Sequence, residues 1–208
     1  MAKALGQRAA LPESAALTPA RRRLFESALA LFSRDGYNGV SLRDIAQDLD
    51  LHATAMYAHV RSKQELLFEL VKMGHEELRD KVRIAVLEAD NHPEQQLRAL
   101  VHANALTHLT VPELARICHS ESAALSPEQA AVIEVLAVDL GALLRDVVER
   151  GIAQGVFDAR DADVAVFTIA AMGARVVDWW TPELGPSREH VAATQADYAV
   201  RMLTRHLP

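Results

Sequence analysis

The chain has little of what marks a secreted or membrane-bound protein. Its single cysteine, Cys118, cannot form a disulfide within the chain, which is typical of a reducing compartment. The first twenty residues contain no apolar run long enough for a signal peptide. The longest uncharged stretch of the second half, Val164 to Ala174, has about half the length that spans a bilayer. We therefore expect a soluble, cytoplasmic protein without a membrane partner.

Glycine, proline and aromatic residues are also scarce. The 208 residues include 9 Gly and 8 Pro, and Phe, Trp and Tyr together make up 5%. Ala and Leu dominate instead, and 50% of the residues are hydrophobic, which favours helices packed around a large core. No stretch alternates apolar and polar residues as a half-buried strand does. These features predict an all-α protein.

Local start and stop signals predict the first helices. Residues 1–17 are small, polar and aperiodic, and we expect them to form a loose tail. Thr18 is a good N-cap, Pro19 suits the first helical position, and Gly36 suits the end of the same helix. Two capping boxes, each a Ser with an acidic residue three positions later, begin further helices: Ser41 with Asp44, and Ser62 with Glu65.

The second and third helices are separated by a tight turn. Three short helices within about fifty residues match the helix-turn-helix arrangement. Asp50 falls in the turn, where a left-handed backbone conformation is required, and Asp tolerates that conformation better than most residues other than glycine. We predict a DNA-binding domain over residues 18–63, with the helix-turn-helix at about 41–60.

Charge is divided unevenly along the chain. Residues 1–63 contain nine Lys/Arg and six Asp/Glu, a net charge of +3, whereas the remainder holds thirteen basic and twenty-two acidic residues, a net charge of −9. A positive end on a negative body would turn one face toward a polyanion. Chance scatter of the charges is the alternative explanation.

Several short motifs follow one another between Arg22 and Leu67. They are "ALALF" at 28–32, "DGY" at 35–37, "SLRDIA" at 41–46 and "MYAHVRSKQEL" at 56–66. This order resembles the DNA-binding domain of the TetR family of transcriptional regulators, in which the last motif reads "LYxHFxSKxxL". The resemblance implies a one-component, DNA-binding transcriptional regulator that acts on double-stranded operator DNA.

The resemblance also implies which residues contact DNA. Ser41 and Arg43 stand where the second helix meets DNA, and small residues at 53–55 let the third helix enter the major groove. Tyr57 and Lys63 match phosphate contacts, which set position rather than sequence. The expected DNA-binding residues are Ser41, Arg43, Ala53, Thr54, Ala55, Tyr57 and Lys63.

The chain departs from the usual TetR pattern around the turn. Asp50 replaces a usual Gly, His52 a usual Ser, and Thr54-Ala55 a usual Gly-Thr. His52 is a poor N-cap, so Asp50 is the alternative cap of the third helix. These differences leave open which bases are read.

Residues 64–208 predict a larger helical domain for ligand binding and dimerisation. The expected helices lie at about 64–88, 93–109, 112–118, 127–155, 161–180 and 187–206. The helix at 161–180 is apolar on all sides and must be buried on all sides, for which one chain of this size hardly offers enough neighbours. The TetR resemblance implies a homodimer through the last two helices. The expected interface residues are Phe167, Met172, Val176, Trp179 and Tyr198.

The resemblance further implies a pocket for a small-molecule inducer. "LARICHSESAALSPEQ" and "VVDWWTPELGPSREHVAATQADYAVRML" resemble a subset of TetR regulators of lipid and steroid catabolism, whose inducers are acyl-CoA thioesters. We therefore expect a repressor that an apolar ligand, an acyl-CoA in this interpretation, releases from its operator. Such a ligand needs apolar lining and cations. The expected ligand-binding residues are Leu106, Leu109, Leu136, Leu140, Met172, Arg98, Arg116 and Arg175, with Arg79 as a further cation.

A helical metal or redox sensor is the alternative function. Cys118, His119 and Glu121 lie close together in the sequence, yet they do not have a recognised metal-ligand spacing. The sequence contains no Gly-rich phosphate loop, nucleophile elbow or spaced carboxylate pair that predicts catalysis. We expect neither enzymatic activity nor a cofactor.

Overall fold

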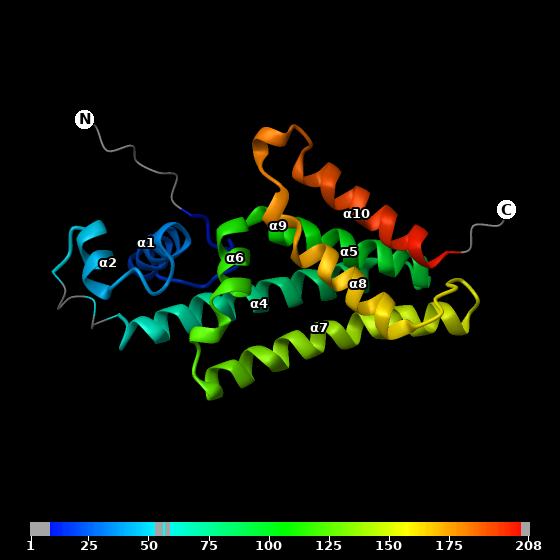
Figure 1. The fold of residues 1–208 in the computed structure, drawn as a ribbon, viewed down its shortest axis with the longest axis horizontal. Coiled ribbons are helices and arrows are strands. Elements are labelled where there is room, and N and C mark those ends of the chain that lie inside the picture. The colour runs from blue at the N-terminus through cyan, green and yellow to red at the C-terminus, as the bar shows by residue number, and fades with distance from the viewer. Residues whose placement is uncertain (1–8, 53–55, 57–58, 205–208) are drawn as a thin grey trace. The chain divides into compact units, whose positions relative to one another are not determined.

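The computed structural model describes residues 9–52, 56 and 59–204. These residues form helices joined by short turns, and none of them lies in a strand, so the predicted all-α fold is confirmed. The chain divides into two compact units, residues 1–75 with 111–133 and residues 76–110 with 134–208. The division falls within two long helices, α4 (Lys63–Glu88) and α7 (Pro127–Ala153), both labelled in Figure 1. The predicted domain boundary after residue 63 stays a prediction.

The first unit begins with the helices that its capping residues predict. Helix α1 (Pro19–Asp35) starts at Thr18, whose side chain accepts a hydrogen bond from the backbone N–H of Arg21, and ends at Gly36 with φ of 74°. Helix α2 (Leu42–Asp48) starts with the expected capping box at Ser41. The first turn of α4 keeps half of its predicted box, because the Glu65 carboxylate accepts from the backbone N–H of Arg61 instead of that of Ser62.

The core of the first unit joins residues that are far apart in the sequence. Helix α6 (Pro112–Ser120) packs against α1, and it is followed by the short 3₁₀ helix η1 (Ser122–Ala124). Side chains from α1, α2, α4, α6 and the first turns of α7 are buried in one apolar cluster, which includes Phe25, Phe32, Ile45, Met56, Leu66, Leu70, Leu114, Ile117 and Ile133. The helix-turn-helix therefore shares its core with residues 111–133.

The prediction of a loose tail is wrong for residues 9–17. Ala9 and Leu11 are buried in the core of the first unit. The Arg22 guanidinium donates hydrogen bonds to the carbonyl oxygens of Pro12 and Ala15, at 3.2 and 3.0 Å. These contacts connect distant positions, which local periodicity does not reveal. Residues 1–8 lie outside the described part of the chain.

The second unit is built around α5 (Pro93–Thr110) and α10 (Arg188–Leu203), which lie side by side (Figure 1). Helix α8 (Ala162–Ala174) packs on both, and the connection to α10 contains α9 (Val176–Trp179) and the 3₁₀ helix η2 (Pro182–Leu184). Its core includes Val82, Leu97, Leu100, Val147, Val148, Val166, Ile169, Ala196 and Ala199. Across the described residues, no helix is both long enough and apolar enough to span a bilayer.

The predicted single helix over 161–180 is broken at Arg175. In a continuous helix the Met172 carbonyl would accept from the backbone N–H of Val176. Here the Gln195 side chain donates to that carbonyl from α10, at 3.4 Å. Gly173 allows Asn104 of α5 to come close, because a Cβ at this position would lie 2.4 Å from the Asn104 Oδ1. The Gln195 side chain thus takes the place of one helical hydrogen bond at this break.

Candidate nucleic-acid interface

The N-terminal end of α2 is closed by a pair of reciprocal hydrogen bonds. The Ser41 hydroxyl and backbone N–H both donate to the Asp44 carboxylate, at 2.6 and 2.8 Å, and the Asp44 backbone N–H donates back to the hydroxyl. The hydrogen bonds from Ser41 lower the pKa of the Asp44 carboxyl. The proton of the Ser41 hydroxyl is therefore engaged within the capping box, and Ser41 would have to release Asp44 in order to donate to a phosphate.

The turn after α2 has the geometry that the sequence predicts. Asp50 has φ of 56°, the left-handed conformation expected there. The next backbone N–H, that of Leu51, donates to the carbonyl of Ala46 at 2.8 Å and closes the end of the helix. Asp50 therefore reverses the chain direction between α2 and the helical residue Met56.

Four of the seven expected DNA contacts, Ala53, Thr54, Ala55 and Tyr57, lie outside the described residues. Met56, between them, is helical and fully buried, and Val60, four residues later, is buried as well. The Val60 backbone N–H donates to the Met56 carbonyl at 3.0 Å, and both side chains belong to the core of the first unit. His59 is exposed.

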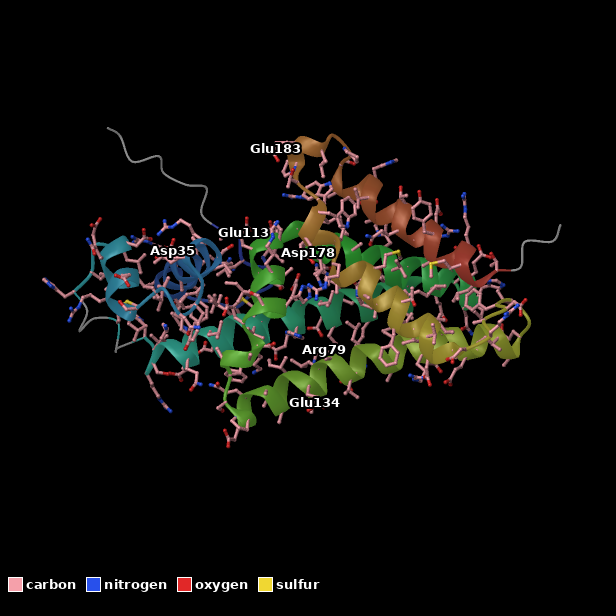
Figure 2. All side chains as sticks on the ribbon, in the orientation of Figure 1. Asp35, Arg79, Glu113, Glu134, Asp178 and Glu183 are labelled. Carbon is pink, nitrogen blue, oxygen red and sulfur yellow. The ribbon has the colours of Figure 1, made fainter. Side chains whose placement is uncertain are left out.

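Two exposed arginines flank this region. Within the described part of the chain, neither the Arg43 nor the Arg61 guanidinium has a hydrogen bond or ion pair, whereas Arg34 pairs with Asp35, which Figure 2 labels, and Arg21 pairs with Glu69. Arg43 was expected from its place in α2. Arg61, which directly precedes the "SK" motif, was not among the expected contacts.

Lys63 does not point toward solvent as a phosphate contact would. Its ammonium donates to the carbonyl oxygens of Tyr37 and Val40, at 2.8 and 2.7 Å, and lies 4.1 Å from the centre of the Tyr37 ring. The expected phosphate contact is therefore at odds with this geometry. The reason is tertiary, since the partners lie more than twenty residues earlier in the chain.

The expected dimer-interface residues divide into two groups. Phe167, Trp179 and Tyr198 expose 70%, 53% and 55% of their surface, and Met172 is half-buried. Val176 is fully buried and has no surface left for a second copy, so the expectation that it lies in an interface is wrong. Sequence reasoning missed two further exposed apolar side chains on α8 and α10, Val164 and Met202.

The expected ligand-binding residues are divided between the two units. All except Arg116 belong to the second unit. Leu109 and Leu136 are buried, and Leu106, Leu140 and Met172 are half-buried.

Three of the expected cations already have carboxylate partners. Arg98 pairs with Asp197 and Glu94, and Arg175 lies 3.2 Å from Asp178, which is labelled in Figure 2. Arg79, also labelled there, lies 2.8 Å from Asp80.

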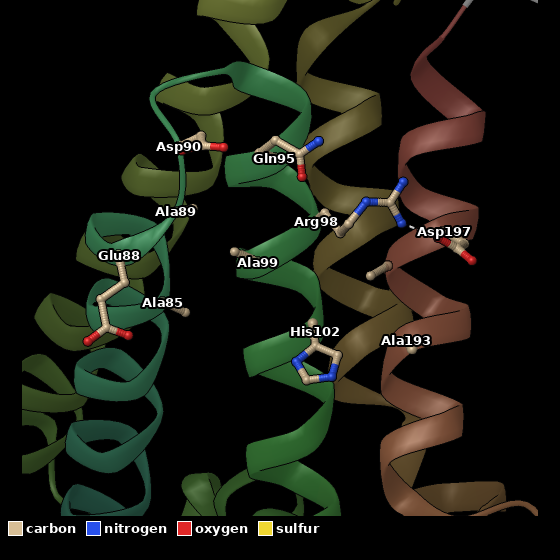
Figure 3. Close-up of a pocket in the computed structure, with 11 residues that line it drawn as sticks. Ala85, Glu88, Ala89, Asp90, Gln95, Arg98, Ala99, His102, Ala193 and Asp197 are labelled. Carbon is tan, nitrogen blue, oxygen red and sulfur yellow. Dashed lines mark hydrogen bonds and ion pairs between the residues drawn. The ribbon is translucent and has the colours of Figure 1, made fainter.

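An open groove in the second unit contains one of these cations. It has a volume of about 500 Å³ and lies along α4, α5 and α10 (Figure 3). Alanines such as Ala99 and Ala193 form much of its lining, and Arg98 and His102 project from α5. None of the five expected apolar ligand contacts lines this groove.

The surroundings of the half-buried Cys118 disfavour the thiolate form of its side chain. Burial raises the pKa of its thiol to about 12, so the thiolate that reacts with oxidants or metals does not form near neutral pH. Its sulfur faces Gly74 on α4, where a Cβ would lie only 2.6 Å away. Among the described residues, no group of three His, Cys, Asp or Glu side chains could hold a metal ion.

Two models of known protein families match this chain, one near its N-terminus and one in its C-terminal part. Residues 24–70 match the family model described as "Bacterial regulatory proteins, tetR family". Residues 90–203 match the model described as "Tetracyclin repressor-like, C-terminal domain". The second match alone covers more than half of the chain.

Individual similar proteins agree with the two family models. The HTH-type transcriptional regulator BetI of Agrobacterium fabrum is 30% identical over 98 residues, which is 47% of this chain and about half of that relative's length (47%). The TetR family transcriptional regulator PfmR from Thermus thermophilus is 30% identical with a TM-score of 0.79, over 86% of this chain and 97% of that one. AibR, solved in complex with isovaleryl coenzyme A and operator DNA, is 26% identical with a TM-score of 0.76, over 88% and 97%. The chain therefore belongs to the TetR family of bacterial transcriptional regulators.

Proposed function

We propose that this protein is a repressor that binds operator DNA as a homodimer and leaves it when a small apolar ligand binds. The observation that carries the DNA-binding part is the turn at Asp50, with φ of 56°. This turn joins α2 to a third helix whose inner face, Met56 and Val60, is buried. In this proposal, the residues on the other side of that helix enter the major groove.

The proposed DNA contacts are of two kinds. Arg43 and Arg61 are exposed cations and suit phosphates or base edges, whereas Ala53, Thr54 and Ala55 are small enough for close approach to bases. Ser41 and Tyr57 complete the proposed set at the phosphate backbone.

A homodimer is supported by the apolar surface of the second unit. Val164 and Phe167 of α8 and Tyr198 and Met202 of α10 are exposed in the single chain. Apolar area removed from water contributes about 25 cal/mol per Å², so a second copy placed on these side chains would be stabilised. A two-fold dimer would place two reading helices about 34–36 Å apart, one turn of DNA.

The proposed inducer is an acyl-CoA, a class of ligand that the similar AibR binds in its complex with isovaleryl coenzyme A and operator DNA. Leu136, Leu140 and Met172 are apolar side chains of the second unit and suit an acyl tail. The paired cations impose a condition, because Arg98 and Arg175 would have to exchange Asp197 and Asp178 for phosphate groups. An acyl-CoA would act by binding the DNA-free conformation more tightly than the DNA-bound one.

A direct test begins with operator selection. DNA fragments that bind the purified protein are selected from a random library, and release is then measured by fluorescence anisotropy with isovaleryl-CoA, a long-chain acyl-CoA, free CoA and the matching fatty acids. We expect release by an acyl-CoA and none by free CoA. Release by the free fatty acids alone would contradict the acyl-CoA proposal and keep the repressor. Failure to select any DNA would contradict the repressor itself.

A further inference from the structure

We propose that Lys63 is a positioning residue that fixes the N-terminal end of α2 for DNA and does not itself contact a phosphate. The inference deepens the proposed function and rests on it. It reassigns the neutralisation of phosphate charge to the exposed Arg61, two residues earlier, together with Arg43 of α2.

All three donor directions of the Lys63 ammonium are occupied within the first unit. A lysine ammonium has three N–H groups and no acceptor. Two of them donate to the carbonyl oxygens of Tyr37 and Val40, at 2.8 and 2.7 Å. The third side of the ammonium faces the Tyr37 ring, whose centre lies 4.1 Å away, within the range of a cation–π contact. No N–H is left for a DNA phosphate.

The two carbonyls belong to the turn that leads into α2. Tyr37 and Val40 are themselves buried, and the Val40 backbone N–H donates to the Tyr37 carbonyl at 3.3 Å. Ser41, the next residue, is the N-cap of α2. Lys63, at the first position of α4, therefore ties the start of α4 to the residues that set the position of Ser41.

The positive charge of Lys63 strengthens its two hydrogen bonds to the turn before α2. A hydrogen bond from an ammonium to a carbonyl is stronger than one between neutral groups, and both carbonyls would lose their charged donor if the ammonium moved to a phosphate. The exposed Arg61 differs from Lys63, because its guanidinium makes no hydrogen bond or ion pair within the described residues. Phosphate contact through Arg61 leaves the turn intact.

Salt dependence separates the two roles. Each phosphate neutralised by a side chain contributes about 0.9 to the slope of log K against log salt concentration. We would measure this slope on the selected operator duplex for the wild type, Lys63→Met, Lys63→Arg and Arg61→Gln, and record the Tm of each protein without DNA.

The expected results are opposite for the two positions. Lys63→Met lowers the Tm by about 5–10 °C and weakens operator binding at every salt concentration, with the wild-type slope. Arg61→Gln keeps the Tm and lowers the slope by about one unit. Lys63→Arg keeps the charge but still lowers the Tm, because a planar guanidinium does not fit the two carbonyls as an ammonium does.

Lys63→Arg decides the question if Lys63→Met does not fold. A wild-type Tm for Lys63→Arg, or a slope that falls by about 0.9 in Lys63→Met at an unchanged Tm, would overturn the positioning role. If the wild type binds no DNA, the proposed function fails, while the Tm differences still report whether Lys63 holds the turn.

Discussion

The Ser27 hydroxyl of α1 donates to the Asp48 carboxylate at the end of α2, with 2.7 Å between the two oxygens. Ser27 is buried, and α1 packs against α2. This hydrogen bond fixes the last residue of α2 two positions before the left-handed Asp50. It therefore links the first helix to the turn that orients the third.

Ser27→Ala should lower the free energy of unfolding by about 1 kcal/mol, because the Asp48 carboxylate loses a partly buried donor. Urea denaturation measures the loss. Ser33→Ala is the matched control, since Ser33 is exposed on the same helix. Equal stability of the two variants would show that the bond contributes nothing.

The stability of variants at Asp50 should depend on how well each residue tolerates the left-handed backbone conformation there. Glycine adopts the left-handed conformation at no steric cost, whereas a β-branched residue loses about 1–2 kcal/mol there. We expect the stability order Asp50→Gly, wild type, Asp50→Val, from highest to lowest Tm. Asn tolerates the left-handed conformation as Asp does but carries no charge. Asp50→Asn therefore separates the effect of backbone conformation on stability from that of charge. A Tm for Asp50→Val equal to that of the wild type would contradict the order.

Charged substitutions should distinguish surface from core in the second unit. Phe167→Glu, at a side chain with 70% exposure, should give a folded monomer, because the change affects only the proposed interface. Val176→Asp, at a fully buried side chain, should lower the helical content itself. Light scattering and circular dichroism report the two effects. Leu87→Glu, at an exposed leucine of α4, is the control that should remain dimeric.

The close approach of α4 and α6 predicts a coupled pair of mutations. Gly74→Ala would place a Cβ 2.6 Å from the Cys118 sulfur and should destabilise the protein by about 1–3 kcal/mol. Cys118→Ala removes that sulfur, so the double variant should recover much of the loss. A double-mutant cycle by thermal unfolding measures the coupling. Additive effects would mean that the two helices move apart freely.

The raised pKa of the Cys118 thiol also predicts a pH effect. Burial raises the pKa of Cys118 to about 12, above the value of about 8.5 for an exposed thiol. Above the lower value, only the unfolded state releases the proton, so this contribution to stability declines as the pH rises from about 9 toward 12. The decline should be smaller in Cys118→Ala, and a thiol reagent should modify the folded wild type slowly at neutral pH. Rapid modification would contradict the raised pKa of the thiol.

Local signals in the sequence predicted the parts of the fold that local bonds determine. The cap at Thr18, the capping box at Ser41 and the left-handed Asp50 each depend on residues within a few positions, and the structure shows all three. The predictions were wrong or incomplete where a residue distant in the sequence supplies the hydrogen-bond partner. Gln195 takes the carbonyl that would continue α8, and the carbonyls of Tyr37 and Val40 take the Lys63 ammonium. Periodicity carries no information about such partners.

The discontinuous first unit has a consequence for synthesis. The helices that precede and follow the Asp50 turn leave the ribosome early, but their core also needs Leu114, Ile117 and Ile133. Helix α5, which belongs to the other unit, is translated before these residues arrive. The nascent chain therefore closes this core only after residue 133 has emerged, and a fragment cut after residue 75 would expose Leu66 and Leu70 to aggregation.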